Sequence, residues 1–307
     1  MVARNQLAGV RRKPTDDTGG TQSKDAPLED AVGYIQRSFD HLLMRARLEP
    51  EAFRDAAVME LGPGDNLGLA LRFLAAGAEK VVAVDRFFPA RDPAHELALY
   101  AALRATLTAE ERTRFDDAVE LKDEPSFNPN RLKLIQGVGI ESMPPGCEPE
   151  TFDFIVSIAV LEHVENNDKA FETMDRLLKP GGVMLHQVDL SDHGIFTGAG
   201  GPPLRFLTVP DFLWRAMISN IGGPNRQMID FYRRTLDRLG YDRTLMPMRL
   251  AGEYQDLDGA EEDISPFVTT EVLSRVQEVR PKLRKRYASA TDKDLLVSGI
   301  FIAARKA

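Results

Sequence analysis

Three of the five histidines lie near carboxylates in two short segments of the chain. His163 follows Glu162 in the sequence LEHV, and the segment HQVDLSDH contains His186, Asp189 and His193. A histidine can accept a proton near neutral pH, and a neighbouring carboxylate can orient its ring for that task. We therefore predict a catalytic group that takes a proton from an oxygen nucleophile. Its four residues are His163, His186, Asp189 and His193.

Within this set, the pattern predicts His193 or His186 as the general base, with Asp189 as the group that orients it. Three alternatives remain open. His186 could instead pack under a helix while Asp189 caps a turn, and His163 could lie in a turn whose charge only balances a helix end. The histidines and aspartates of HQVDLSDH, Asp192 included, could also bind Mg²⁺, although we predict no metal.

A glycine-rich segment, ELGPGDN at residues 60–66, stands between an apolar run and a helical pattern. Its glycines let the backbone approach a ligand closely, next to the unpaired N–H groups of a helix N-terminus. Asp85 ends the next apolar run, 21 residues after Gly64, and a carboxylate there can accept both hydroxyls of a ribose. Leu67 stands where a dinucleotide fingerprint needs its third glycine, which disfavours a nicotinamide cofactor. Glu60 suits instead a nucleoside cofactor with a cationic amino-acid part.

Short apolar runs alternate with helical stretches and indicate how these motifs are positioned. Runs of this kind are typical of buried parallel strands joined by helices. We predict an α/β fold with a doubly wound, mostly parallel seven-stranded sheet, helices on both faces and helical inserts. The expected strands are residues 56–61, 80–84, 133–137, 152–158, 182–188, 244–250 and 295–303. Open sheets of this class bind ligands at the carboxyl ends of their strands, so the motifs should meet there.

The remainder of the chain is predicted to be a tail and a single domain built around this sheet. We expect a disordered tail at residues 1–27, because the segment lacks hydrophobic periodicity, and one domain at residues 28–307. Thr108 and Glu111 predict a capping box, and residues 225–239 predict a helix that Gly240 ends. Parts of the domain outside the sheet are expected to be N-terminal helices (28–55), a helical insert (86–131), a lid or acceptor insert (190–224), and a linker with a helix (251–294).

Taken together, VMELGPGDN, AVDRF, IESMPPGCEPETFDFIVSIAVLEHV and RLLKPGGVML resemble, in this order over residues 56–188, the class I S-adenosylmethionine-dependent methyltransferases. The resemblance implies a Rossmann-like fold and S-adenosyl-L-methionine as the cofactor. It also implies cofactor contacts from the glycine segment and from the ends of strands two, three and four. These contacts are Glu60, Gly62, Pro63, Gly64, Asp65, Asn66, Asp85, Arg86, Gly139, Ile140, Glu141, Ser157 and Ala159.

The second half of the chain is similar, less specifically, to bacterial methyltransferases that carry H-x-x-D-L-x-D-H and N-R motifs and modify glycans or small molecules. These motifs are residues 186–193 and 225–226 here. The likeness implies a small-molecule or sugar-type acceptor. It makes Arg226 a candidate acceptor contact, with a simple helix cap at Asn225 as the alternative. The aromatic residues before this motif are expected in the core, with an acceptor pocket as the alternative: Phe206, Phe212 and Trp214.

Composition restricts the partners. The 39 Lys and Arg against 47 Asp and Glu give a net charge of −8, which provides no general attraction to nucleic acid. The single cysteine, Cys147, excludes an intramolecular disulfide. No signal peptide or membrane-spanning run is readable, so we predict no membrane span and a cytoplasmic location.

These observations together predict a methyltransferase that moves a methyl group in line from S-adenosylmethionine to a hydroxyl. Placement of the reacting atoms supplies most of the acceleration in such a displacement, and a histidine would accept the hydroxyl proton. Two alternatives remain: a cofactor-binding regulatory subunit without catalysis, and an aminopropyl transferase.

Overall fold

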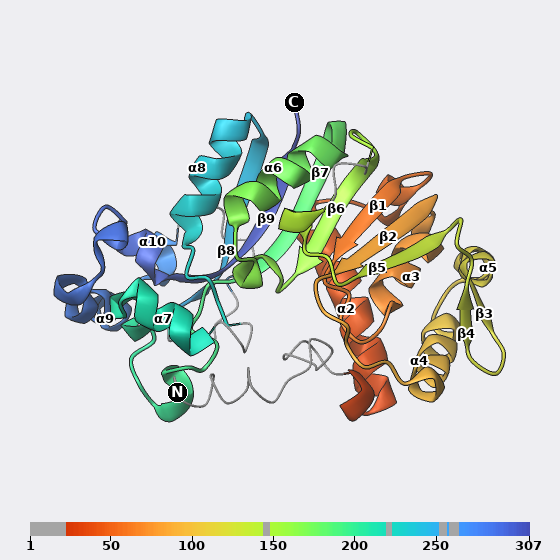
Figure 1. Cartoon of the computed structure of the whole chain (residues 1–307), viewed down its shortest axis with the longest axis horizontal. Helices are drawn as coiled ribbons and strands as arrows, with labels where there is room; N and C mark the ends of the chain where they lie inside the picture. The colour runs from red at the N-terminus through yellow and green to blue at the C-terminus, as the bar shows by residue number, and fades with distance from the viewer. Residues whose placement is uncertain (1–22, 144–147, 219–222, 252–256, 258–263) are drawn as a thin grey trace.

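The computed structural model describes residues 23–143, 148–218, 223–251, 257 and 264–307. Its centre is a seven-stranded sheet in the order β5-β2-β1-β6-β7-β9-β8 (Figure 1). Within this sheet, β9 runs opposite to the other six strands, which are parallel to one another. The predicted α/β class and doubly wound sheet are therefore confirmed. The strands are β1 (Ala57–Leu61), β2 (Lys80–Asp85), β5 (Leu132–Gln136), β6 (Phe152–Ile158), β7 (Leu178–Asp189), β8 (Asp242–Leu250) and β9 (Val297–Arg305).

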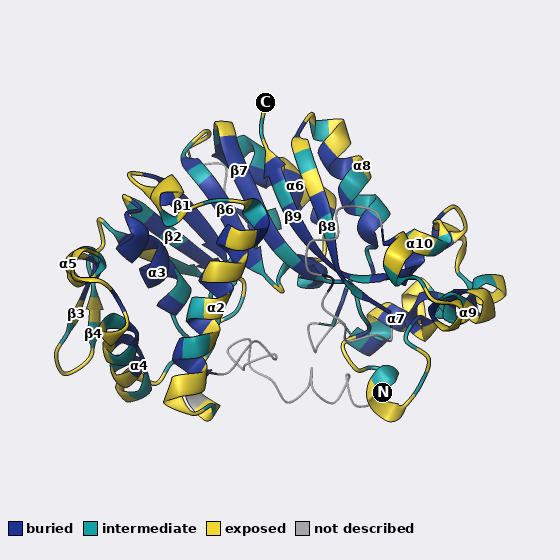
Figure 2. Cartoon of the chain, turned by 180° about the vertical axis from the view of Figure 1, so that it is seen from behind, coloured by how far each residue is buried: buried dark blue, intermediate teal, exposed yellow. Residues whose placement is uncertain are grey.

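Helices cover both faces of the sheet because adjacent strand residues point to opposite sides. On β1, Val58 belongs to the core that includes residues of α2, α3, α4 and α5, whereas Met59 belongs to the core that includes residues of the later helices. Figure 1 shows α6 and α8 in front of the sheet, and Figure 2, from behind, shows α2 and α3 on the other face. The helices are α2 (Leu28–Ala46), α3 (Gly68–Ala76), α4 (Pro93–Ala105), α5 (Ala109–Ala118), α6 (Asn167–Leu177), α7 (Asp211–Ile218), α8 (Ile229–Leu239), α9 (Thr270–Val279) and α10 (Asp292–Leu296).

Local sequence signals identified several helix ends correctly. Thr108 and Glu111 form the predicted capping box at the start of α5, and Gly240 ends α8 in the left-handed conformation. The hairpin of β3 (Val119–Leu121) and β4 (Pro125–Phe127) was not predicted. Strands of three residues are too short to show an alternating pattern.

The described part of the chain begins before residue 28. Ser23–Asp25, which fall in the predicted tail, form a short 3₁₀ helix, and Ser23 is buried. Residues 1–22 lie outside the described part of the chain. Among the described residues, no helix is long and apolar enough to cross a membrane.

Candidate active site

The glycine loop after β1 approaches the neighbouring strand exit so closely that a side chain would not fit. Gly62 has a φ of +66°, and its amide donates to the carbonyl of Val84 at 2.8 Å. A Cβ on Gly62 would lie 2.5 Å from Cγ2 of Val160. Gly64, with a φ of +73°, completes the turn. Both backbone conformations and the close packing therefore require glycine.

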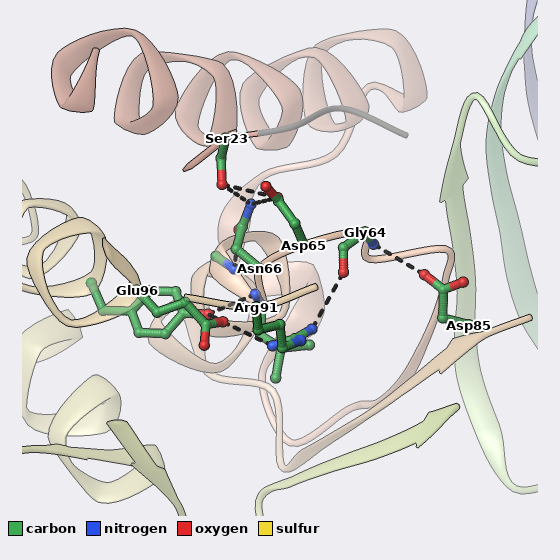
Figure 3. Close-up of polar contacts among 10 residues, drawn as sticks. Ser23, Gly64, Asp65, Asn66, Asp85, Arg91 and Glu96 are labelled. Carbon is green, nitrogen blue, oxygen red and sulfur yellow. Dashed lines mark hydrogen bonds and ion pairs between the residues drawn. The ribbon is translucent and has the colours of Figure 1, made fainter. Parts of the chain in front are cut away.

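Asp85 connects the end of β2 to the glycine loop. One of its carboxylate oxygens accepts from the amide of Gly64 at 3.2 Å (Figure 3). The other accepts from the amide of Phe87 at 2.8 Å. Burial raises the pKa of Asp85 above its usual value. The carboxylate is thus held at a fixed position beside the loop.

A network of polar side chains also holds the glycine loop in place. Arg91 binds Glu96 at 2.9 Å and donates to the carbonyl of Gly64 at 3.4 Å (Figure 3). The hydroxyl of Tyr100 donates to Glu96 at 2.6 Å and accepts from the amide of Leu67 at 2.8 Å. The sequence carries no signal for this network, because Gly64 and Leu67 lie 27 and 33 positions before the side chains that bind them.

The start of the described chain also contacts the loop. The Ser23 hydroxyl donates to Asp65 at 2.9 Å and accepts from the side-chain amide of Asn66 at 3.2 Å. Figure 3 shows Ser23 over the loop, just before α2. Loop residues Asp65 and Asn66 are therefore held by a segment that precedes them by more than forty positions.

A cavity of about 340 Å³ opens at these strand ends. Of the thirteen residues predicted to contact the cofactor, those that line it are Glu60, Gly62, Pro63, Gly64, Asp65, Asn66, Asp85, Arg86, Gly139, Ile140, Glu141 and Ala159. The remaining one, Ser157, does not line it, because its hydroxyl shares a 2.8 Å hydrogen bond with Nδ1 of His186 inside the fold. Arg86 contacts Glu141 at 3.6 Å and Glu165 across this region.

Glu60 gives the cavity a buried acid. Its carboxylate accepts a hydrogen bond from the amide of Ala70 in the first turn of α3, and burial raises its pKa to about 8. Its Oε2 is buried and has no hydrogen-bond partner among the described residues. A cationic group bound in the cavity would both favour the ionised acid and satisfy this oxygen. The site therefore fits a ligand with an ammonium group.

Two histidines form another part of the cavity wall. His163 ends the 3₁₀ turn Leu161–His163 after β6, and His193 lies in the turn after β7. Both residues line the cavity, and their ring centroids lie 4.9 Å apart at 79°. His193 has a φ of +50°, which is uncommon for a residue other than glycine. Of the three histidines expected at the strand ends, these two line the cavity.

Two acids stand behind the histidine pair. Oδ2 of Asp189 lies 3.9 Å from Nε2 of His193 and 3.0 Å from Nη2 of Arg249. Burial alone would raise the pKa of Asp189, but Arg249 and hydrogen bonds from Ser191 hold it below its usual value. Glu162 accepts from the amide of Asp189 at 2.9 Å, and burial raises the pKa of Glu162 to about 8.

His186 does not belong to this site, which corrects our expectation that it could be the base. The side chain is fully buried, its ring lies 6.4 Å from that of Phe171, and it does not line the cavity. Burial lowers its pKa to about 3. Packing under a helix, the alternative for this residue, describes its position.

The Mg²⁺ cluster considered from the sequence is not assembled either. Besides the buried His186, its member Asp192 is occupied by hydrogen bonds from the amides of Gly194, Phe196 and Thr197 and from the hydroxyl of Thr197. Asp192 therefore shapes the turn that carries His193.

Asn225 fastens the turn that carries Glu162 and His163. Its side-chain amide donates to the carbonyls of Leu161 at 2.8 Å and Val164 at 2.9 Å, and its backbone amide donates to the carbonyl of Glu162 at 2.7 Å. Asn225 is thus no helix cap, since α8 begins only at Ile229. The sequence did not indicate this role.

Arg226 holds the insert together and does not reach the cavity. Its side chain, 1% exposed, donates to the carbonyls of Phe206 and Val209 and pairs with Asp211. This placement corrects the expectation that Arg226 contacts the acceptor. None of the three aromatic residues lines the cavity: Phe206 and Trp214 are buried in the core, and Phe212 is 77% exposed.

The comparisons with known proteins agree with this geometry. A family model described as a methyltransferase domain matches residues 32–242. No curated protein matches the chain. A phosphoethanolamine N-methyltransferase of Haemonchus contortus in complex with S-adenosyl-L-methionine is similar at 17% identity and a TM-score of 0.46, over 88% of this chain and 52% of its own. The present chain thus spans about half the length of that structure.

A second similar structure is an S-adenosylmethionine-dependent methyltransferase of Mesorhizobium loti, at 14% identity and a TM-score of 0.44, over 89% of this chain and all of its own. The family match covers more than half of the chain and includes the glycine loop, Asp85 and both cavity histidines. The chain belongs to the methyltransferase-domain family, as a class I S-adenosylmethionine-dependent methyltransferase.

Proposed function

We propose that this methyltransferase methylates a hydroxyl group of a small molecule or sugar. The observation that carries the proposal is the pair His163 and His193, whose imidazoles lie edge to face in the wall of the cavity that contains the glycine loop. A hydroxyl must lose its proton near the transition state to become a good nucleophile, and an imidazole at this position can accept it. Bound S-adenosylmethionine would supply the methyl group as an activated sulfonium.

Cofactor binding is proposed for the twelve cavity-lining residues named above. The bare backbone at Gly62 and Gly64 permits close approach, and the buried carboxylate of Asp85 can accept hydrogen bonds from ribose hydroxyls. Glu60 would balance the cationic amino-acid end, because its free oxygen needs a donor. These groups would bind and orient S-adenosylmethionine, and the methyl transfer would take place next to His163 and His193.

His193 is the proposed proton acceptor, with Asp189 as the residue that orients it. The carboxylate of Asp189 lies 3.9 Å from Nε2 of His193, and Arg249 keeps that carboxylate ionised. An ionised partner stabilises the imidazolium that forms when the ring takes up a proton. His163 stands opposite and would position the acceptor oxygen.

Transfer of a labelled methyl group to compounds in metabolite extracts tests whether the acceptor is a hydroxyl. The purified chain is incubated with methyl-labelled S-adenosylmethionine and with metabolite extracts, and labelled products are identified by mass spectrometry. We expect the label on oxygen of a small molecule or glycan. Label found only on nitrogen or carbon would overturn the hydroxyl assignment. Tight binding of S-adenosylhomocysteine without transfer to any acceptor would favour the regulatory subunit.

A further inference from the structure

The proposed reaction uses two histidines of the cavity wall but gives no task to the acid beside them. Glu162 is buried, and its Oε1 accepts from the amide of Asp189. Its Oε2 is also buried and has no hydrogen-bond partner among the described residues. A buried carboxylate oxygen without a partner is costly unless a ligand or ion satisfies it.

Donor atoms of Glu162, His163 and His193 all lie within 4.8 Å of one another. They come from two separate loops, the turn after β6 and the turn after β7, which meet only because β6 and β7 are neighbours in the sheet. We propose that these three side chains form a binding site for one divalent transition-metal ion.

The chemistry of the donors selects the class of ion. Two imidazoles and one carboxylate suit Zn²⁺, Co²⁺ or Ni²⁺, whereas Mg²⁺ and Ca²⁺ prefer oxygen ligands throughout. Such an ion lies about 2.0–2.2 Å from each donor, so two ligands of a tetrahedral site stand about 3.4 Å apart. The three donors, which lie within 4.8 Å of one another, therefore need to close by at most about 1.4 Å. His193, in a turn at the cavity wall, can supply that movement by rotation of its side chain.

The surroundings of the three residues match those of ligands in known metal sites. Metal-binding histidines usually donate their second ring N–H to a carboxylate, and ligating carboxylates are themselves held by hydrogen bonds. Asp189 stands 3.9 Å from Nε2 of His193, and its amide holds Glu162. Asn225 fixes the backbone of the turn that carries Glu162 and His163. Three protein ligands leave a fourth position that opens into the cavity.

Occupation of this site has a consequence that rests on the proposed function. An imidazole that ligates a metal uses its lone pair for the ion and cannot use the same lone pair to accept a proton. A metal-loaded protein would therefore lack the proposed base, and the metal would inhibit methyl transfer reversibly.

Metal titration tests the site without any acceptor. The full chain is stripped with a chelator and titrated with Zn²⁺ by calorimetry and with Co²⁺ by visible absorption. We expect one equivalent to bind, and we expect Glu162→Gln, His163→Gln and His193→Gln each to weaken binding at least tenfold. His41→Gln, a change at an exposed histidine on α2, is the matched control and should bind as the parent does. Binding of S-adenosylhomocysteine checks that each variant is folded.

Two results would overturn the metal site: absence of binding at millimolar Zn²⁺ and Co²⁺, or binding that all three substitutions leave unchanged. The methyl-transfer assay then separates the site from the reaction. Inhibition by Zn²⁺, reversed by chelator, supports both proposals. Acceleration by Zn²⁺ would leave the metal site standing and remove His193 as the base.

Discussion

The two walls of the cavity are built in different ways. Around the glycine loop, the cofactor wall consists of one continuous segment and the end of the adjacent strand, and backbone groups dominate it: Gly62 and Gly64 adopt left-handed conformations and Asp85 binds the amide of Gly64. The opposite wall consists of side chains from separate loops, such as His163 and His193. A site built from backbone groups can be recognised as a motif of consecutive residues. A site built from side chains of separate loops depends on which loops the fold brings together.

The difference also appears in what fixes each wall. The glycine loop is held by side chains at most 43 positions away, those of Ser23, Asp85, Arg91 and Tyr100. The turn with His163 is fixed by Asn225, more than sixty residues later, and the neighbouring Arg226 ties the same segment to the insert through Phe206 and Val209. We therefore expect changes in the second wall to affect turnover and changes in the first to affect cofactor affinity.

The largest expected effect is the loss of the proposed base. His193→Gln should lower kcat by about 10²–10⁴-fold, the usual contribution of general-base catalysis. Affinity for S-adenosylhomocysteine, measured by calorimetry, should stay within about twofold because the cofactor wall is untouched. The control is His41→Gln, at the exposed histidine on α2. A variant with full turnover would remove His193 from the mechanism.

A change in the cofactor wall should produce the opposite pattern. In Gly62→Ala the left-handed backbone is strained, and the new methyl group meets Val160 at 2.5 Å. We expect cofactor affinity to fall by roughly 10–100-fold, as a strain of about 1–3 kcal/mol implies. Gly240→Ala is a matched control, since Gly240 also has a positive φ, +78°, but has nothing within 4 Å. Equal cofactor affinity in the two variants would contradict the close-approach argument.

Removal of the Asn225 side chain tests whether the histidine wall of the cavity depends on contacts with distant residues. Asn225→Ala takes a donor from the carbonyls of Leu161 and Val164. The carbonyl of Leu161 keeps the amide of Val164, whereas the carbonyl of Val164 loses its side-chain partner, and an unpaired buried carbonyl costs about 1–3 kcal/mol. We expect lower stability in urea and roughly tenfold lower kcat, with cofactor affinity little changed. Asn128→Ala removes similar loop hydrogen bonds far from the cavity and should leave kcat alone. If Asn225→Ala lowered kcat and cofactor affinity equally, the two walls would not be independent.

The smallest effect is a pH dependence of the cofactor wall. Burial raises the pKa of Glu60 to about 8, so the acid is mostly protonated at pH 7 in the free protein. A cationic ligand favours the ionised form and lowers that pKa, so binding releases a proton. Affinity for S-adenosylhomocysteine should therefore rise by roughly fivefold between about pH 7 and pH 8. Calorimetry in two buffers measures the number of protons released on binding. In Glu60→Gln, the protons that come from Glu60 should no longer be released.

Much of the fold could be predicted because its signals are local. Short β-branched runs and the helices between them indicated a parallel sheet, and the capping box of Thr108 and the end at Gly240 were confirmed. The two three-residue strands β3 and β4 were missed because a periodic pattern needs more residues. Twelve of thirteen expected cofactor contacts line the cavity, since most of them follow one another in the chain.

By itself, the sequence determined the sheet, the glycine loop and the carboxylate at the end of β2, because each depends on backbone conformation or on spacing along a few residues. Only the tertiary structure decided which histidines face the cavity. His186 and His193 stand seven positions apart in one motif, yet the strand buries the first and the turn exposes the second. The packing of α6 and the left-handed turn at His193 make that choice, and both arise from contacts between distant segments.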